Sequence, residues 1–213
     1  MSPRTWLTVG AAIAASLTAA IALFGGSVLA ATVAEPAYTV ELREGAFEVR
    51  RYAPIVLAET SITGTFDQAS SDGFRRLLDF ISGNNRTSAS IAMTAPVTQT
   101  NAKIAMTAPV TQTAGVDGWL VGFVMPAGST LATLPTPNDP RVVLRERPER
   151  REAVARFSGN ASDTTRLEWT ARLTAWIAAQ GLTPAGNPEV QRYDPPWTLP
   201  PLRRNEIHVA VEE

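Results

Sequence analysis

The hydrophobic periodicity of the chain changes in an order that occurs twice, and this order limits the folds available to it. Helical spacing of apolar residues appears in two segments, residues 66–81 and about 161–180. Segments typical of β-strands flank each helix: 38–54, 55–62, 119–126, 141–148, 151–159, 189–197 and 205–211. The order predicts two similar halves of class α+β, which share one antiparallel sheet system covered by two helices.

Turn and cap residues set the boundaries of these elements. Glu44-Gly45 interrupts the alternation of the first segment and predicts a β-hairpin. Asp67 or Ser70 is expected to cap the first helix, and Gly83 to end it. Gly181 is expected to end the second helix.

One decapeptide, IAMTAPVTQT, occurs at residues 91–100 and again at 104–113. Its Ile, Val and Thr residues favour strands, and Asn101-Ala102-Lys103 between the copies predicts a short hairpin loop. Pro96 and Pro109 lack an amide hydrogen, so these strands are expected at an edge or a bulge. A duplication that lengthened a hairpin explains the repeat, and a doubled binding element is the alternative.

The first thirty residues differ from the rest of the chain. One charge, Arg4, precedes an uncharged apolar run from Leu7 to Phe24 and a small-residue ending at Ala30. This pattern is that of a secretory signal peptide. The run is also long enough for an uncleaved membrane anchor. In both interpretations residues 31–213 form a domain outside the cytoplasm, either periplasmic or anchored to the outer face of the cytoplasmic membrane.

The composition narrows the classes of function. The formal net charge is −1 and there is no dense basic stripe, so nucleic acid is not expected as a partner. There is no cysteine, and His208 is the only histidine, so neither a thiol nucleophile nor the spacing of a metal site is present. His208 lies in an alternating strand and is expected at its rim or face. We expect no enzymatic activity.

Aromatic and apolar residues stand beside arginines in four segments. They are RRY at 50–52, FRRLL at 74–78, RYDPPW at 192–197 and RRNE at 203–206. Aromatic rings offer stacking, and guanidinium groups bind carboxylates in a bidentate manner. The combination suits a planar apolar ligand that carries carboxylates at one edge, although these segments also make ordinary turns and strand ends.

The segments FEVRRYAP, GFRRLLDFISGNN, IAMTAPV, FVMP and YDPPWTLPPLRRNEIHV, in this order, resemble the SOUL haem-binding family over about residues 38–211. The resemblance implies a distorted antiparallel β-barrel of two αβ halves flanked by two α-helices. It also implies weak binding of haem or a related tetrapyrrole in an apolar groove beside a helix.

The chain departs from the family where some members carry a histidine proposed as an axial haem ligand, because Arg51 stands there. Met93 and Met106 offer thioether sulfur atoms instead. Arg75, Arg76, Arg203 and Arg204 are candidates for propionate contacts by residue type and neighbourhood. The expected binding set is completed by Tyr52, Phe74, Leu78, Tyr193 and Trp197.

These observations lead to one main hypothesis, an exported, non-enzymatic tetrapyrrole-binding protein. The alternative is an envelope sensor or protein-interaction module that kept the fold and does not bind haem. An enzyme acting on a tetrapyrrole stays a third interpretation, although no base or nucleophile is positioned for it. The membrane is expected as a partner only through an uncleaved N-terminal segment.

Overall fold

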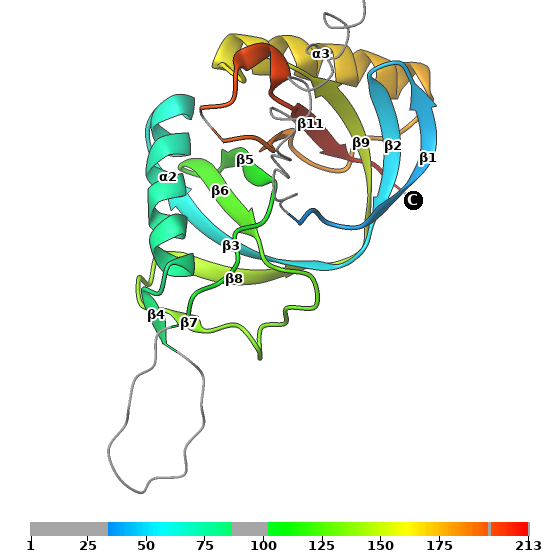
Figure 1. Ribbon diagram of the computed structural model, residues 1–213. Coiled ribbons are helices and arrows are strands. Elements are labelled where there is room, and N and C mark those ends of the chain that lie inside the picture. The colour runs from blue at the N-terminus through cyan, green and yellow to red at the C-terminus, as the bar shows by residue number, and fades with distance from the viewer. Residues whose placement is uncertain (1–33, 87–101, 196, 213) are drawn as a thin grey trace, which may run out of the picture. The chain divides into compact units, whose positions relative to one another are not determined.

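A computed structural model describes residues 34–86, 102–195 and 197–212 (Figure 1). The chain divides into two compact units, Met1–Thr32 and Val33–Glu213, and every helix and strand given below belongs to the second. The predicted leader, residues 1–30, lies outside the described residues. Within the described residues, no helix is both long and apolar enough to cross a bilayer.

Nine strands of the described residues form one antiparallel sheet in the order β1-β2-β9-β11-β10-β5-β6-β3-β8. Two further short strands, β4 and β7, pair with each other. The predicted strands are confirmed within one or two residues at most ends. The strands are β1 (Tyr38–Glu44), β2 (Phe47–Tyr52), β3 (Ile55–Ile62), β4 (Asn85–Arg86), β5 (Val110–Gly115), β6 (Gly118–Val124), β7 (Thr136–Pro137), β8 (Val142–Arg147), β9 (Arg150–Phe157), β10 (Glu189–Arg192) and β11 (Asn205–Ala210).

The two similar halves have the same connectivity. In the first, β3 leads to helix α2 (Phe66–Ile81) and then to the hairpin β5-β6, which places β6 between β3 and β5. In the second, β9 leads to helix α3 (Asp163–Ala179) and then to β10 and β11, which places β11 between β9 and β10. The halves join where β5 pairs with β10.

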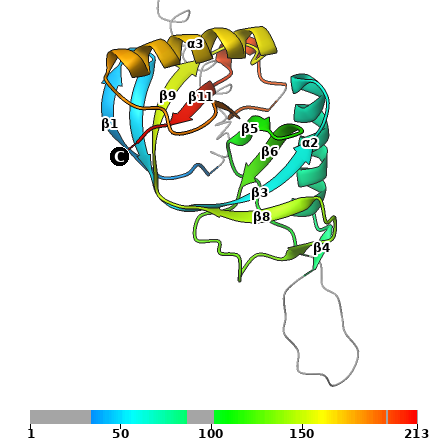
Figure 2. The same ribbon diagram turned by 180° about the vertical axis from the view of Figure 1, so that it is seen from behind.

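The sheet curls because two pairs of consecutive strands cross from one half to the other. β2 continues into β3 as one long segment, and β8 continues into β9 as another. These two long segments pair with each other in a single antiparallel register, β2 with β9 and β3 with β8. Tyr52 lies opposite Arg150, and a few residues along Ile55 lies opposite Arg147. Opposite ends of the sheet therefore meet, and the predicted α+β distorted barrel with two flanking helices is confirmed (Figure 2).

Each helix covers part of the outer face of the sheet (Figure 1). α2 packs on β3 and β6, and α3 packs on β9 and β11. The close approach of α2 to β6 depends on Gly73, since a Cβ atom at this position would lie 2.6–2.9 Å from the side chain of Val121 in β6. Two apolar clusters result: one includes Leu173 and Ile177 of α3, and the other includes Leu77 of α2.

The predicted cap of the first helix was wrong by a few residues. Thr65 is the N-cap, and it forms a capping box with Gln68, whose side chain accepts from the Thr65 amide at 3.2 Å. Asp67 lies in the first turn, and Ser70 lies within the helix. Thr65 satisfies amides that would otherwise lack partners, which makes it the better start signal.

The repeated decapeptide is described only in its second copy, because residues 91–100 lie outside the described residues. Val110 to Thr113 of that copy begin β5. The expected edge position was wrong, since β5 lies between β10 and β6 and pairs with both. Pro109 directly precedes the strand, so its missing amide hydrogen removes no bond from the ladder.

Candidate functional site

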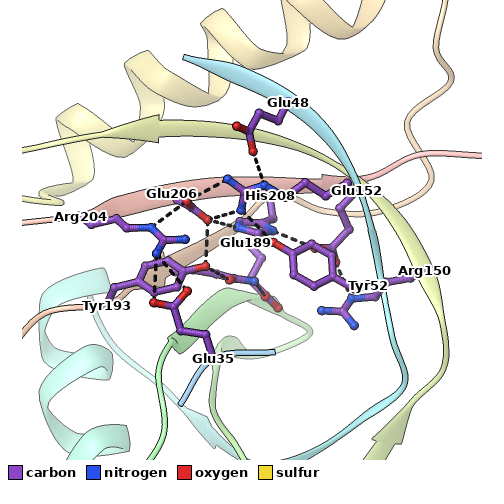
Figure 3. Close-up of polar contacts among 12 residues, drawn as sticks. Glu35, Glu48, Tyr52, Arg150, Glu152, Glu189, Tyr193, Arg204, Glu206 and His208 are labelled. Atoms are coloured by element: carbon purple, nitrogen blue, oxygen red, sulfur yellow. Dashed lines mark hydrogen bonds and ion pairs between the residues drawn. The ribbon is translucent and has the colours of Figure 1, made fainter. Parts of the chain in front are cut away.

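The inner face of the curled sheet carries charged and polar side chains. Side chains alternate between the two faces of a strand. The residues that face α3 are therefore apolar, such as Val49, Ala153 and Ile207, while their neighbours point inward. Figure 3 shows that these inward residues come from several strands and form one hydrogen-bonded network. Its members include Glu48, Arg50, Tyr52, Arg150, Glu152, Glu189, Gln191, Tyr193, Arg204, Glu206 and His208.

Glu206 is the centre of this network and has no exposed surface. Its carboxylate accepts from Arg50 at 2.8 and 3.1 Å, and from Arg204 at 3.0 Å. The Tyr193 hydroxyl donates to it at 2.8 Å. Burial raises the pKa of Glu206, but hydrogen bonds and charge from His208 and Arg50 outweigh burial and hold that pKa well below its usual range.

His208 is fully buried, and of its two expected positions, the rim or the face of a strand, it occupies the face, on the inner side of the sheet. Its Nδ1 lies 2.8 Å from Glu152, and its Nε2 lies 3.0 Å from Glu206. Burial opposes the charged ring, yet the two carboxylates outweigh burial and raise the pKa of His208. Because carboxylates engage both ring nitrogens, His208 has no free nitrogen for an iron atom in this arrangement.

The pKa values of Glu152, Tyr52 and Tyr193 in this network are also shifted. Burial raises the pKa of Glu152, but hydrogen bonding and charge from His208 prevail and lower it to about 2. Burial raises the pKa values of Tyr52 and Tyr193, so both phenols keep their protons at neutral pH. In the described part of the chain, no three acidic or histidine side chains are arranged to hold a metal ion.

Three predicted site residues, Tyr52, Tyr193 and Arg204, belong to this network, whereas Arg51 of the same strand as Tyr52 does not. Tyr52 is buried and accepts from Arg50 at 2.9 Å, and Arg204 lies over the Tyr193 ring at 3.8 Å. Arg204 also pairs with Glu35 at 2.9 Å. Arg51 points the other way from β2 and pairs with Glu41 at 2.8 Å.

Of the predicted residues of α2, Arg75 and Leu78 are exposed on its outer side, whereas Phe74 and Arg76 face the sheet. Arg76 donates to the Thr60 hydroxyl of β3 at 2.7 Å. Phe74 is partly buried, with its ring 5.3 Å from that of Phe123. Leu78 is 37% exposed, and the exposed Arg75 pairs with Asp72 at 3.0 Å.

Met106 lies in the described segment 102–109, which leads into β5. In this segment the Ile104 amide donates to the Ile81 carbonyl at the end of α2 at 2.8 Å. Met106 is 45% exposed, and Ile104 and Val110 pack against the same cluster as Phe74. Met93 lies outside the described residues. The structure therefore does not gather the predicted residues in one place.

The loop between β10 and β11 presents large apolar side chains to solvent. Trp197, Leu199 and Leu202 are 82%, 67% and 72% exposed. Arg203 braces the loop, because its Nε donates to the Thr198 carbonyl and its Nη1 to the side chain of Asn160, both at 2.7 Å. A braced loop that exposes three apolar side chains is typical of a binding surface. We call Trp197, Leu199 and Leu202 the apolar loop patch.

Arg192, at the base of this loop, was absent from the predicted binding set. Its guanidinium donates to Ser70 of α2 at 2.9 Å, to Gln112 at 3.0 Å and to the Ala161 carbonyl at 3.2 Å. It forms no ion pair with any described residue. Burial accordingly lowers the pKa of Arg192 to about 10. The letters RYDPPW contained Arg192, but nothing in them distinguished it from the paired arginines.

Two pockets among the described residues have volumes of about 230 and about 270 Å³. The first is mostly apolar and is lined by Ala34, Ile55 and Met125 among others. The second opens on the inner face and is lined by Arg147, Arg150 and His208 among others. Both are smaller than the roughly 300–1,000 Å³ of pockets that enclose drug-sized ligands. Neither of these two pockets is large enough to enclose a porphyrin.

Fold and site together define an α+β barrel of two βαββ halves with a charged interior and an exposed apolar loop. The model of the SOUL heme-binding protein family matches residues 33–210. The chain belongs to this family of heme-binding proteins, which makes haem or a related tetrapyrrole its expected ligand.

Individual relatives are similar over shorter stretches. Heme-binding protein 1 of Xenopus laevis is 43% identical over 53 residues, which cover 24% of this chain and 28% of that protein. Heme-binding protein 2 of Homo sapiens is 40% identical over 55 residues, which cover 25% and 27%. The chain thus spans about a quarter of the length of the curated relatives that it matches. The EcmrR C-terminal domain shares the fold, with a TM-score of 0.51 and 12% identity over 83% of this chain and 98% of that one.

Proposed function

We propose that this protein is an exported, non-enzymatic carrier that holds haem or a related tetrapyrrole on an open surface between the apolar loop patch and α2. The observation that carries the proposal is the family match over residues 33–210. The apolar run at residues 7–24 supports export. The absence of a cysteine from the sequence and the full engagement of its one histidine support a role in binding.

The apolar loop patch supports this location for the macrocycle. Its side chains stay exposed although the backbone is held, since the Gly159 amide donates to the Pro200 carbonyl at 2.9 Å and the Arg204 amide to Asp194 at 2.6 Å. The loop lies near α2, to which the Arg192–Ser70 hydrogen bond links its base (Figure 1). The exposed Leu78 lies further along the same helix.

The cation that the ligand requires is available at Arg192. Burying roughly 300 Å² of porphyrin surface contributes about 7 kcal/mol at about 25 cal/mol per Å². Association costs at least about 4 kcal/mol, so apolar area alone leaves weak affinity. A propionate on a guanidinium adds roughly 1.5–3 kcal/mol and brings the affinity toward the micromolar range. Arg192 forms no ion pair with a described residue, and Arg75 on α2 is a second, more exposed candidate.

The state of His208 supports binding that does not depend on iron. Both of its nitrogens are engaged and the ring is buried, so we expect haem and metal-free protoporphyrin IX to bind with similar affinity. Met106 is the exposed thioether among the described residues that would change this expectation. Strong selectivity for haem would therefore point to Met106 or to a ligand outside the described residues.

The test is a titration of residues 31–213 with haemin and with protoporphyrin IX, followed by absorbance and by quenching of tryptophan fluorescence. Replacing Trp197 and Leu202 together by serine should weaken binding of both ligands about tenfold or more, since two anchoring side chains lose their contacts. The matched control is Val116→Ser, which removes a fully exposed apolar side chain elsewhere and should change nothing.

Arg192→Lys and Arg75→Ala separate the two candidate propionate partners. Arg192→Lys keeps a charge but loses the planar donor geometry, and it should weaken the dicarboxylate porphyrin more than its dimethyl ester. If Arg192→Lys weakened binding of the dicarboxylate porphyrin and of its dimethyl ester equally, the loss would come from altered folding and not from a lost propionate contact. No spectral change at tens of micromolar haemin would favour the alternative, an interaction module on the same fold.

A further inference from the structure

The pocket on the inner face lies apart from the proposed tetrapyrrole surface and has a chemistry of its own. Its volume is about 270 Å³, and its wall includes Arg147, Arg150, Glu152, Glu189 and His208. Ala114 and Ala210 contribute short apolar side chains to the same wall. The pocket is therefore small, strongly charged and apolar on one part of its surface.

The carboxylates of this wall are already neutralised. Glu152 accepts from Arg150 Nε at 2.7 Å and lies 2.8 Å from His208 Nδ1. Glu189 accepts from both terminal nitrogens of Arg147, at 3.2 and 3.0 Å. Gln191 donates to Glu189 as well, at 2.7 Å. Neither carboxylate lacks a cation, so little negative charge is left to repel an anion.

The guanidinium of Arg150, in contrast, has an unused donor. Its side chain is 13% exposed and stacks over the Tyr52 ring at 4.8 Å. The Nη1 atom is buried and has no hydrogen-bond partner among the described residues. A buried donor without an acceptor is unfavourable, and more so when it belongs to a charged group. Arg147 and His208 are each paired with carboxylates, so the donor of this wall that an anion could use is Nη1 of Arg150.

We propose that this pocket binds a small aliphatic monocarboxylate, with its carboxylate on Nη1 of Arg150 and its short chain against Ala114 and Ala210. One free donor nitrogen fits one carboxylate group. The volume fits a molecule of a few carbon atoms and excludes a porphyrin, which separates this site from the tetrapyrrole surface. The barrel thus has two binding sites of different chemistry.

The experiment measures binding of sodium butyrate by saturation-transfer NMR and by calorimetry in a buffer of low anion content. Butyrate should bind saturably in the millimolar range, and butyramide, which has no charge, should not. Arg150→Lys should weaken butyrate about tenfold or more, because the free planar donor is lost. The matched control is Arg151→Lys, which changes the next residue of β9, paired with Glu41 on the other face, and should leave butyrate binding unchanged.

A second variant keeps the proposal testable if Arg150→Lys does not fold. Ala210→Leu fills the pocket without removing a charge and should abolish butyrate binding while haemin binding stays as in the parent protein. The proposal is overturned if butyrate does not saturate, if inorganic phosphate binds as well as butyrate, or if Ala210→Leu binds butyrate normally. Either of the last two results would mean that Nη1 of Arg150 binds an adventitious anion or an ordered water molecule.

Discussion

The negative charge of Glu206 should be essential for the stability of the domain, because it pairs with the buried guanidinium of Arg50. Arg50 is 2% exposed and lies 2.8 Å from Glu206. Glu206→Gln keeps the shape of the side chain and removes its charge, and the new amide hydrogens face those of Arg50. Removing one partner of a buried ion pair costs about 3–5 kcal/mol. For a domain of this size, that loss lowers Tm by roughly 6–20 °C.

The assay is urea unfolding followed by tryptophan fluorescence, with calorimetry for Tm. The matched control is Glu41→Gln, because Glu41 also pairs with two arginines, Arg51 and Arg151, but lies at the surface of the sheet. Its loss should cost about 1 kcal/mol or less. If Glu206→Gln and Glu41→Gln lose the same small amount of stability, the Arg50–Glu206 pair is not buried away from water. That result would refute the description of the inner network.

Four further predictions concern the same fold. His208 has a raised pKa when folded, so its contribution to stability is complete below about pH 6.5 and is lost as the pH rises through the folded pKa. His208→Gln should flatten the pH dependence of the unfolding free energy above about pH 6.5, and an unchanged slope would contradict the raised pKa. The carboxyl of Glu152 works in the opposite direction, with stability present above about pH 4.3 and lost as the pH falls toward its pKa of about 2. Gly73→Ala should destabilise the domain by about 1–3 kcal/mol through contact with Val121, and adding Val121→Ala should restore part of the loss, whereas additive losses would refute the contact. Deleting residues 91–103 leaves one intact decapeptide for β5 and shortens the connection, so calorimetry should show a stability within about 1 kcal/mol of the parent, and unfolding of the variant would show that both copies are needed.

Much of the fold could be predicted from periodicity because short-range spacing reflects which face of an element is buried. The strand at residues 205–211 was predicted from the alternation in NEIHVAV, and β11 is found at Asn205–Ala210. The error concerned the polar positions of that alternation. Outward-facing and inward-facing polar residues have the same period, so the alternation placed His208 at the rim or face of a strand but could not show that Glu206 and His208 face the interior of a curled sheet.

The propionate candidates show the same limit. Arg75, Arg76, Arg203 and Arg204 were chosen by residue type and neighbourhood, and each has a partner in the structure. Arg192 differs from Arg75, Arg76 and Arg204 in forming no ion pair with a described residue, and that difference arises from the strands and helices around it. A signal was present in NEIHVA, where Glu206 and His208 alternate with Ile207 and Val209, as expected for a strand with one charged face.

The sequence by itself determined the order of strands and helices, their approximate ends and the resemblance to a haem-binding family. These follow from local spacing and from motifs that can be read along one strand or helix. Tertiary structure alone decided which charges meet. Arg50 and Glu206 are 156 residues apart in the chain, and only the pairing of β2 and β11 with β9 brings them together. The reason is physical: the energy of a charge depends on its burial and its partners, and long-range strand register sets both.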